Sequence, residues 1–293
     1  MTANIPVKSI QVKSVLSKSN LPVWGFSVNP YIWCTHGCRY CYASFMKRFT
    51  WHTEEWWKFL DIKYREPIKN PQKYRWKSIF IGSVTDPYLP LEEKYWRTRA
   101  FLEEIRWYDV GISIATKSDI ILRDLELIQS FKDARVSWSI NTLDEEFKND
   151  MDYAVSIQRR IEAMKQFHAA WVRTTCFISP IFPWITKVKE IIEATKEHCN
   201  LIWLENLNLR GDYKVKILKY IKEKYPALHP LYDEIYNKKS RNYREMLNQE
   251  IEHFCKKENL LYLRNNDNIQ RPFHEPPIVV NYFYHEEIKK SAK

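Results

Sequence analysis

The chain of 293 residues carries 46 Lys and Arg against 36 Asp and Glu, a formal net charge of +10, and 45% of its residues are hydrophobic. This composition supports one large core or two smaller ones, and no run of eighteen apolar residues is present that would cross a membrane. The first residues, MTANIPVKSIQVKS, lack the apolar stretch of a signal peptide, so we expect a cytoplasmic protein with no membrane partner. The charge favours polyanionic partners, although a basic surface also serves solubility alone.

Short apolar runs rich in β-branched residues recur along the chain and predict strands. Segments of helical period lie between several of them, as in the i, i+4, i+7 spacing of Ile157, Ile161 and Met164. Strands that alternate with helices indicate βαβ units and a parallel sheet. We therefore expect an α/β fold, a partial parallel (β/α)6 barrel of the TIM type, with its site at the carboxyl ends of the strands. The predicted strands lie within residues 23–28, 78–85, 111–116, 135–141, 172–179 and 201–207.

The pattern changes beyond about residue 211. Residues 212–293 are basic and rich in tyrosine, and stretches such as YKVKILKYIKEKY are helical in character. We expect residues 1–211 to form the barrel with an N-terminal lead-in. Residues 212–293 would then form a helical extension packed on the barrel.

Three of the six cysteines lie close together in NPYIWCTHGCRYCYA, residues 29–43, directly after the first predicted strand. Cys34, Cys38 and Cys41 are one ligand short of a structural zinc site, which needs four protein ligands and usually two separated pairs. No second pair follows, and His36 lies inside the loop itself. A [4Fe–4S] cluster bound by three thiolates leaves one iron open to another ligand. The remaining three cysteines stand alone and are expected to be small buried apolar side chains.

The second predicted strand ends in GSVTDPYLPLEEKYWRTR, residues 82–99. The chain has only five glycines, so Gly82 here and Gly37 in the cysteine loop are expected where a side chain would obstruct something. The small residues, the hydroxyl of Thr85 and the carboxylate of Asp86 suit a ligand contact. The alternative is that Asp86 and the following proline form an ordinary turn, with Thr85 as its cap.

The CxxxCxxC spacing, with an aromatic residue before the last cysteine, resembles the signature of the radical S-adenosylmethionine (radical SAM) enzymes. The combination of NPYxxCxHGCxYCYA with TDPYxPxE and a later TR is similar to the family grouped with spore photoproduct lyase and DNA repair photolyases. Other segments match in outline, so that the resemblance covers about residues 23–210. They are ATKSDIILRDLELI (115–128), SWSINTLDEE (137–146), RRIEAM (159–164) and ISPIFP (178–183).

The resemblance implies an enzyme in which Cys34, Cys38 and Cys41 hold a [4Fe–4S] cluster. The amino and carboxylate groups of S-adenosylmethionine (SAM) would bind the fourth iron. An electron from the reduced cluster would cleave SAM, and the 5′-deoxyadenosyl radical would abstract a substrate hydrogen. A one-electron donor of the flavodoxin or ferredoxin type is implied as a partner.

The resemblance also implies which residues contact SAM. Tyr40 would lie against the adenine, Lys117 would pair with the SAM carboxylate, and Ser139 would hydrogen-bond nearby. Strand alternation supports part of this, because it turns the polar residues of SWSIN to one face and Trp138 and Ile140 to the other. A solvated loop lysine is the alternative for Lys117. The expected SAM-binding residues are Tyr40, Gly82, Ser83, Thr85, Asp86, Lys117, Ser137, Ser139 and Asn141.

Tyr42 and Glu205 are the candidate catalytic residues. Tyr42 follows the last cysteine, and the resemblance implies that it relays hydrogen; simple packing against the loop is the alternative. Glu205 ends the sixth predicted strand beside further polar residues. It would orient the substrate or bind the cofactor ribose, or else help to cap the next helix.

Two departures from the family pattern bear on the reaction. Spore photoproduct lyase has a cysteine that quenches the product radical, where this chain has Ser83, and no cysteine occurs between residues 42 and 175. The acidic-proline motif that many relatives carry after the fourth strand is absent from EEFKNDMDYAVS. We therefore expect the scaffold of the lyase without its reaction.

Composition provides the only indication of the substrate. Residues 63–77, KYREPIKNPQKYRWK, carry six basic residues against one acid, with Tyr64, Tyr74 and Trp76 between them. Phosphate contacts with aromatic stacking are typical of proteins that bind single strands or flipped bases of DNA or RNA. The alternative is a loop whose aromatics pack on the barrel while its lysines lie in solvent.

Three functional hypotheses follow. The first is a radical SAM enzyme, of lyase or base-modifying type, that acts on a nucleic-acid base or nucleotide. The second is a radical SAM enzyme that modifies a peptide, a partner protein or a small metabolite. The third is a non-enzymatic iron–sulfur or zinc protein that binds nucleic acid.

Overall fold

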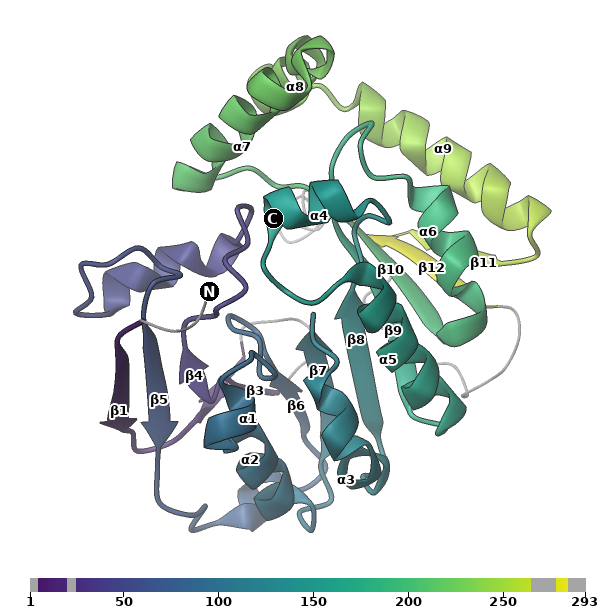
Figure 1. Cartoon of the computed structure of the whole chain (residues 1–293). Helices are drawn as coiled ribbons and strands as arrows, with labels where there is room; N and C mark the ends of the chain where they lie inside the picture. The colour runs from purple at the N-terminus through teal and green to yellow at the C-terminus, as the bar shows by residue number, and fades with distance from the viewer. Residues whose placement is uncertain (1–4, 20–24, 265–277, 284–293) are drawn as a thin grey trace, which may run out of the picture.

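The computed structural model describes residues 5–19, 25–264 and 278–283. A nine-stranded sheet runs through it, and six strands that follow one another along the chain lie side by side and parallel in its middle (Figure 1). Each of the six overlaps a predicted strand, so the α/β fold with a partial (β/α)6 barrel is confirmed. They are β3 (Phe26–Val28), β6 (Ser78–Ile81), β7 (Gly111–Thr116), β8 (Ala134–Ser139), β9 (Arg173–Ile181) and β10 (Leu201–Asn206).

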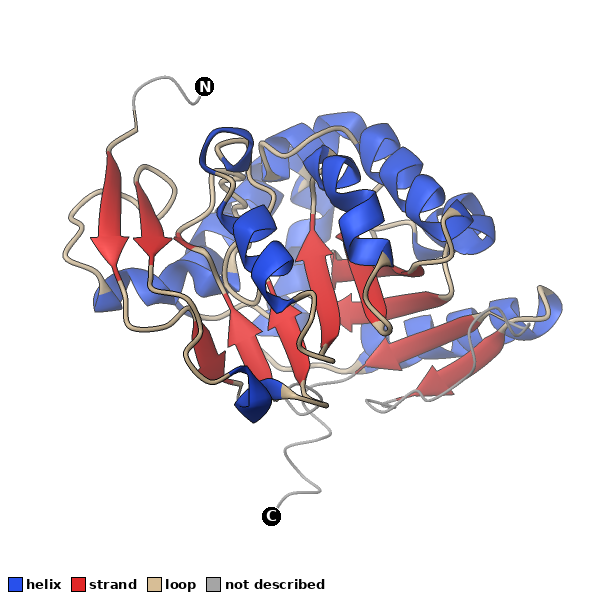
Figure 2. Cartoon of the chain, turned by 90° about the horizontal axis from the view of Figure 1, so that it is seen from below, coloured by secondary structure: helices blue, strands red, loops and turns tan. Residues whose placement is uncertain are grey.

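Helices connect these strands in turn (Figures 1 and 2). Helix α5 packs against both β8 and β9, and α6 packs against β9. Short 3-10 helices, labelled η, complete several connections. The elements are α1 (Glu92–Tyr95) and α2 (Arg97–Ile105) after β6, η3 (Ile120–Asp124) and α3 (Leu125–Gln129) after β7, α4 (Glu145–Met151) and α5 (Ile157–Ala169) after β8, and α6 (Val188–Thr195) and η4 (Lys196–His198) after β9.

The main core lies between the sheet and these helices. On β8 the expected alternation is present: Val136 and Trp138 are fully buried, whereas Ser137 and Ser139 are half-buried on the other side. Trp138 packs edge-on against Phe167 of α5, with ring centroids 5.3 Å apart. The three isolated cysteines are buried as predicted, at positions Cys176, Cys199 and Cys255.

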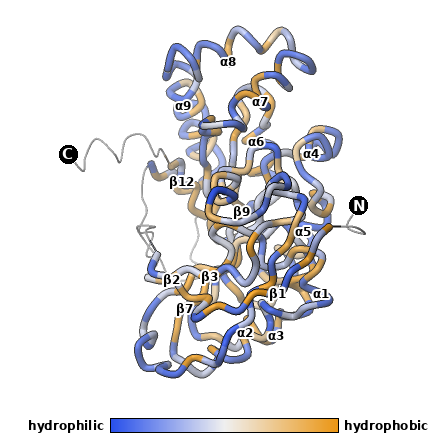
Figure 3. The backbone as a smooth tube through the Cα atoms, turned by 90° about the vertical axis from the view of Figure 1, so that its left-hand side faces the viewer, coloured by the Kyte–Doolittle hydropathy of each residue, from blue (hydrophilic) through white to orange (hydrophobic). Residues whose placement is uncertain are grey.

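The C-terminal segment is only partly the expected helical extension. Its described residues contain α7 (Gly211–Lys224), η5 (Pro226–Leu228), α8 (His229–Tyr236) and α9 (Asn242–Lys257), along which hydrophobic and hydrophilic positions alternate (Figure 3). Two strands were missed, β11 (Leu261–Arg264) and β12 (Val279–Phe283). They are short apolar runs, and β12 is buried along its length because it pairs parallel with β10, with β11 beyond it. The division between residues 211 and 212 stays a prediction, although the described sheet crosses it.

In a second, three-stranded sheet, β1 (Val7–Gln11) of the N-terminal lead-in pairs with β5 (Leu60–Tyr64), which also pairs with β4 (Tyr31–Ile32); β4 and β5 lie between β3 and β6 in the chain. A short strand β2 (Leu16–Lys18) pairs antiparallel with β3 at one edge of the main sheet, and β11 forms its other edge, so the described sheet is open. The cysteine loop leaves β4 and continues into η1 (Tyr42–Phe49), and η2 (Pro71–Tyr74) precedes β6. The cysteine loop is therefore held between the two sheets.

A buried ionic network explains why the NPY, TDPYxPxE and LRD segments occur together. The hydroxyl of Tyr31, from NPY, donates to the carboxylate of Glu92, which is completely buried. Arg123, from LRD, donates to the same carboxylate at 2.6 Å, and the backbone N–H of Thr98 donates to it at 3.1 Å. These segments are far apart in sequence, so the motif combination serves first to join the small sheet to the barrel.

We predict that Glu92→Ala destabilises the protein by about 3–5 kcal/mol, because it leaves the Tyr31 hydroxyl and the Thr98 N–H without their buried acceptor and removes the nearer of the two carboxylate partners of Arg123. Glu93→Ala is the matched control, since Glu93 is the next residue of α1 and is exposed; its effect should stay within about 0.5 kcal/mol. The free energy of unfolding of each variant is measured by urea denaturation. Equal stability of the two variants would refute the structural role of this network.

Candidate functional site

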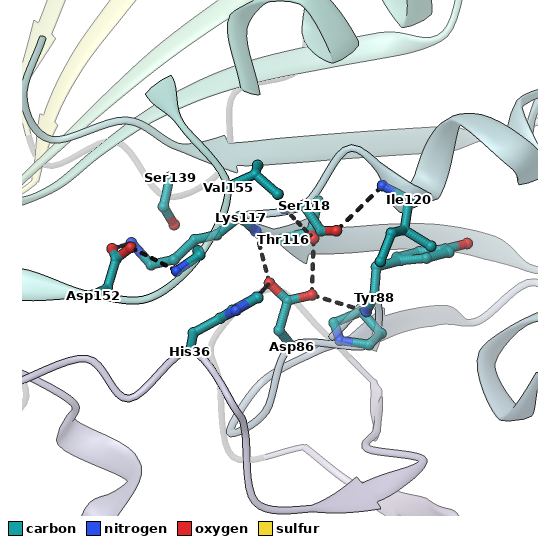
Figure 4. Close-up of polar contacts among 12 residues, drawn as sticks. His36, Asp86, Tyr88, Thr116, Lys117, Ser118, Ile120, Ser139, Asp152 and Val155 are labelled. Carbon is teal, nitrogen blue, oxygen red and sulfur yellow. Dashed lines mark hydrogen bonds and ion pairs between the residues drawn. The ribbon is translucent and has the colours of Figure 1, made fainter. Parts of the chain in front are cut away.

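The carboxylate of Asp86 joins three strand-end segments (Figure 4). It accepts hydrogen bonds from His36 of the cysteine loop at 2.9 Å, from the hydroxyl of Thr116 at 2.8 Å and from the backbone N–H of Lys117 at 2.7 Å. The N–H of Tyr88 donates to it at 2.8 Å and closes a turn. The ends of β6 and β7 are thereby fixed to the cysteine loop.

These bonds decide between the two interpretations of Asp86. Four donors occupy a carboxylate that has about four acceptor positions. Burial opposes its ionisation, but the charge and hydrogen bond of His36 and the backbone N–H groups outweigh burial and hold the pKa of Asp86 below its usual value. The geometry favours the turn-forming alternative for Asp86 over direct contact with a cofactor.

The two glycines occupy positions that a side chain would block. Gly82 has φ +98°, and a Cβ there would lie 2.8 Å from the carbonyl oxygen of Ala115. Gly37 has φ +57°, and a Cβ there would lie 2.7 Å from the ring of Tyr153. Both positions therefore require glycine, as the sequence predicted.

Asn29, the first residue of NPY, holds the loop after β6. Its amide nitrogen donates to the hydroxyl of Ser83 at 2.8 Å, and its amide oxygen accepts from the N–H of Val84 at 3.0 Å and from the hydroxyl of Thr85 at 3.4 Å. The hydroxyl of Tyr42 donates to the carbonyl oxygen of Ser83. The predicted SAM loop is thus preorganised by residues on both sides of the cysteine loop, and the role of Asn29 was missed.

A second buried carboxylate, Asp152, stands on the other side of the cysteine loop. Arg160, which is completely buried, donates to it at 2.8 Å, and the ammonium of Lys117 lies 3.3 Å from it. Lys117 also donates to the hydroxyl of Tyr40 at 2.8 Å, and the ammonium of Lys148 lies 3.8 Å from Asp152. The prediction that Lys117 reaches into the site agrees with this placement, whereas the alternative of a solvated lysine is wrong.

Three cations surround this single carboxylate. Burial opposes the ionisation of Asp152, but Lys117 and Arg160 outweigh burial and hold its pKa well below the usual value. The excess of positive charge beside Tyr40 and Lys117 suits an anionic group such as the carboxylate of SAM. Sequence reasoning missed Asp152 and Arg160 because Asp152 is not followed by proline, and Arg160 lies eight residues farther on a helix.

The polar residues expected to face SAM from β8 and from the segment after it differ in their surroundings. Ser137 and Ser139 are half-buried on the side of β8 opposite Trp138, and the carbonyl oxygen of Ser139 accepts from Arg160 at 3.1 Å. Asn141 is buried, and its carbonyl oxygen accepts from the hydroxyl of Thr186 at 2.9 Å. The side-chain amide of Asn141 also donates to the carbonyl oxygen of Pro180 at 3.5 Å. Asn141 therefore supports the loop before α6, and contact of Ser137, Ser139 and Asn141 with SAM stays a prediction.

The two candidate catalytic residues lie near each other. Tyr42 is 59% exposed, yet the surrounding protein still desolvates its phenol, and burial together with Cys41 and Glu205 raises the pKa of Tyr42. Glu205 accepts from the indole N–H of Trp203 at 3.0 Å and from the hydroxyl of Ser179 at 3.3 Å. Tyr42 is therefore not simply packed against the loop, and Glu205 does not cap the next helix. The catalytic roles of both residues stay predictions.

The polar groups around the cysteine loop fit an iron–sulfur cluster. Five buried side-chain nitrogen and oxygen atoms of the described residues lack a hydrogen-bond partner, and four of them belong to or pack on this loop. The indole of Trp56 lies near enough to Cys41 to lower the pKa of its thiol, although it does not reach hydrogen-bond geometry. Sulfur atoms of a cluster accept such hydrogen bonds. The four atoms are Trp33 Nε1, Thr35 Oγ1, His36 Nδ1 and Trp56 Nε1.

The thiols themselves also fit this ligand. Cys34, Cys38 and Cys41 are free and half-buried, and burial raises the pKa of each, to about 12 for Cys38. Coordination to a metal is what deprotonates a thiol in such a place. In residues 5–19, 25–264 and 278–283, no three His, Cys, Asp or Glu side chains converge on one point that a single ion would occupy. A four-iron cluster instead takes its three thiolates on three different irons.

The comparison with known families decides the assignment. Residues 28–196 match the family model described as the radical SAM superfamily. The chain belongs to the radical SAM superfamily. Membership in it implies SAM and a [4Fe–4S] cluster as cofactors. Two relatives are uncharacterized protein MJ0683 of Methanocaldococcus jannaschii, 31% identical over 79% of this chain and 88% of that protein, and the radical SAM Nalpha-GlyT isomerase of Pseudomonas phage M6, 23% identical over 54% of this chain and 33% of that protein.

Among solved structures, a radical SAM enzyme shares the fold. A spore photoproduct lyase mutant has a TM-score of 0.64 over 95% of this chain and 82% of that chain, at 14% identity. Another lyase structure, with bound AdoMet and dinucleoside spore photoproduct, has a TM-score of 0.56 over 75% of this chain and 66% of that chain, at 14% identity. At this identity the likeness concerns the fold alone.

The basic and aromatic segment 63–77 does not lie at the radical SAM site. It connects the small sheet to the start of β6, and Trp76 and Lys77 pair with the backbone before and at the start of β7, at the opposite end of the sheet. Lys63 donates to the carbonyl oxygen of Asn29 at 3.0 Å, and Tyr74 packs on Phe26. This position at the other end of the strands does not favour the segment as a surface that presents substrate to the site, and its binding of nucleic acid stays a prediction.

No helix within the described ranges is long and apolar enough to cross a membrane.

We predict that Lys117→Met weakens SAM binding about 10- to 100-fold, because it removes a charged hydrogen-bond donor worth about 1.5–3 kcal/mol. Iron content should stay unchanged, since Asp152 keeps Arg160 and Lys148 as partners. Calorimetric titration of anaerobic reconstituted protein with SAM measures the effect. Lys132→Met, at an exposed lysine, is the control. Unchanged SAM affinity in Lys117→Met would contradict the assignment.

Proposed function

We propose that this radical SAM enzyme abstracts hydrogen from a nucleic-acid base or a nucleotide. The observation that carries the proposal is the likeness in fold to spore photoproduct lyase over 95% of this chain, together with lyase structures that hold a dinucleoside spore photoproduct. The net charge of +10 supports a polyanionic substrate. The phage relative is named a radical SAM Nalpha-GlyT isomerase, so its name also refers to radical SAM chemistry.

The chain's own residues divide the work at the strand ends. Cys34, Cys38 and Cys41 would bind three irons of the cluster, which together with SAM supplies one-electron cleavage and hydrogen abstraction. The ammonium of Lys117 would hold the SAM carboxylate, in place of part of its contact with Asp152, and Tyr40, to which Lys117 donates, would lie against the adenine. The backbone of residues 82–85, fixed by Asn29, would meet the methionine amino group.

The substrate side of the site would be formed by Tyr42 and Glu205. The Glu205 carboxylate is oriented by Trp203 and Ser179, so it is placed to accept a hydrogen bond from a base edge or a sugar hydroxyl. The hydroxyl of Ser83 already accepts a hydrogen bond from Asn29, and an O–H bond yields its hydrogen to a radical less readily than an S–H bond. We therefore propose a base modification rather than the hydrogen-return path of the lyase.

The proposal also includes the electron donor and the cellular location of the enzyme. A flavodoxin or ferredoxin type donor would supply the electron that SAM cleavage consumes. The six cysteines are all free, which suits the reducing cytoplasm.

Anaerobic turnover tests the proposal. Reconstituted protein is incubated with SAM, reductant, and single-stranded DNA, RNA or mixed nucleosides, in parallel with peptides and small metabolites. We expect 5′-deoxyadenosine formation to rise only with nucleic acid or nucleosides, and a new nucleoside mass after digestion. The Cys38→Ala variant, which lacks a cluster ligand, should form none. Stimulation by peptides or metabolites alone would overturn the nucleic-acid proposal.

We predict that Tyr42→Phe lowers substrate conversion at least tenfold while SAM cleavage without substrate stays within about twofold. The reason is that the variant loses only the phenol hydroxyl, which general hydrogen or proton transfer at the substrate would use. Both quantities come from the same reactions, as modified nucleoside and as 5′-deoxyadenosine. If both fall together, Tyr42 supports the loop after β6 through its bond to Ser83 and has no separate role in turnover.

A further inference from the structure

Exposed aromatic side chains gather between the cysteine loop and β5. Phe45, Phe49, Trp51 and Trp57 all lie between residues 45 and 57, and Trp51 is fully exposed. With the 54% exposed Tyr153, they are called the aromatic rim here. Exposed aromatic groups of this density mark an interaction surface rather than an ordinary protein surface.

The aromatic rim is joined directly to the radical SAM site. The rings of Trp57 and Tyr153 lie 6.1 Å apart, and the N–H of Tyr153 donates to the carbonyl oxygen of His36 at 2.7 Å. The rim starts three residues after Tyr42, whose hydroxyl bonds to Ser83. A molecule that lies on the rim would therefore reach Tyr42 without crossing another part of the fold.

Positive charge accompanies the rim. The guanidinium of Arg48 lies 5.3 Å from the ring centroid of Phe45 and 4.7 Å from that of Phe49, and the ammonium of Lys58 lies 4.7 Å from the ring of Trp57. Lys58 is paired with Glu55 at 2.8 Å, whereas the ion pairs within the described ranges leave Arg48 without a carboxylate partner. The rim thus combines faces on which flat groups stack with cations that anions approach.

Helix α7 supplies further positive charge. In the view of Figure 1 it lies above the segment that follows the cysteine loop. It carries five lysines against Asp212 and Glu223. Lys58, and beyond it Lys216 of α7, lower the pKa of Glu55, so the helix lies within electrostatic reach of the rim segment. The guanidinium of Arg39, from the cysteine loop, lies 5.5 Å from the ring centroid of Tyr220 of α7, so the helix lies beside that loop.

We propose that the aromatic rim and the lysines of α7 bind an unpaired nucleic-acid strand and present one of its bases to Tyr42. Bases stack on the rim, and phosphates lie toward Arg48 and Lys216. A duplex hides its base faces, so an unpaired strand fits this surface better. The inference rests on the proposed function and adds to it the form of the substrate and the surface that recognises it.

Binding is measured by fluorescence anisotropy with a labelled 20-nucleotide DNA or RNA strand and with its duplex. We expect the single strand to bind at least tenfold more tightly than the duplex. Trp51→Ala and Phe49→Ala should each raise its Kd about 5- to 50-fold. Lys216→Gln should lower the slope of log Kd against log salt by about 0.7.

Trp107→Ala is the matched control, because Trp107 is 77% exposed and has Arg106 4.7 Å from its ring, yet it precedes β7 at the far end of the sheet. It should leave the Kd within twofold. Iron content and the urea midpoint of each variant confirm that the fold is intact. Trp51 makes no contact that the fold needs, so its variant keeps the test free of unfolding.

Several results would overturn the inference. It is wrong if the single strand does not bind, if the duplex binds as tightly, or if Trp51→Ala and Phe49→Ala bind like Trp107→Ala. It is also wrong if the two rim variants lose only the binding of an acidic flavodoxin-type electron donor. If the rim variants bind the strand normally and still modify nucleic acid, the rim is not the binding surface, but the proposed function stands. If the rim variants lose strand binding while no nucleoside is modified, the surface stands and the proposed reaction fails.

Discussion

The site depends first on the buried carboxylate of Asp86. Its four hydrogen bonds join the cysteine loop to the ends of β6 and β7, because the donors are His36, Tyr88, Thr116 and the N–H of Lys117. A buried carboxylate is stable only when donors replace the lost water. Satisfying it therefore fixes the relative positions of all three segments. The positions of the thiols and of the Lys117 side chain follow from this one requirement.

Asp152 lies on the other side of the cysteine loop from Asp86, and the two carboxylates have different partners and different roles. Asp86 receives mainly neutral donors, so it acts as a structural joint. Asp152 lies among Arg160, Lys117 and Lys148, so its surroundings keep an excess of positive charge. A cluster with three thiolates and a SAM carboxylate would bring negative charge to this place. Burying these cations costs desolvation free energy, and the binding of an anionic ligand would offset that cost.

The sequence predicted what depends on local patterns and missed what depends on distant partners. The six barrel strands were found because each is a short apolar run between polar segments, and Gly82 because so few glycines are present. The strands β11 and β12 were missed because their burial comes from pairing with β10, which the local pattern does not show. Asp152 was missed for the same reason, since its partner Lys117 lies 35 positions earlier in the chain. The place of residues 63–77 was not predictable, because composition does not say at which end of a sheet a loop lies.

Ser83 stands where the resemblance implies the radical-quenching cysteine of spore photoproduct lyase. A radical formed on a substrate is quenched either by taking a hydrogen atom or by forming or breaking a further bond. Ser83 is a poor hydrogen source and its hydroxyl is bound to Asn29. The nearest phenol, Tyr42, donates to the backbone of the same residue and is 59% exposed toward solvent. Hydrogen transfer from the phenol of Tyr42, whose O–H bond is weaker than that of a serine hydroxyl, would leave a tyrosyl radical. That radical would regain its hydrogen with an electron from the one-electron donor and a proton from the solvent, to which Tyr42 is exposed.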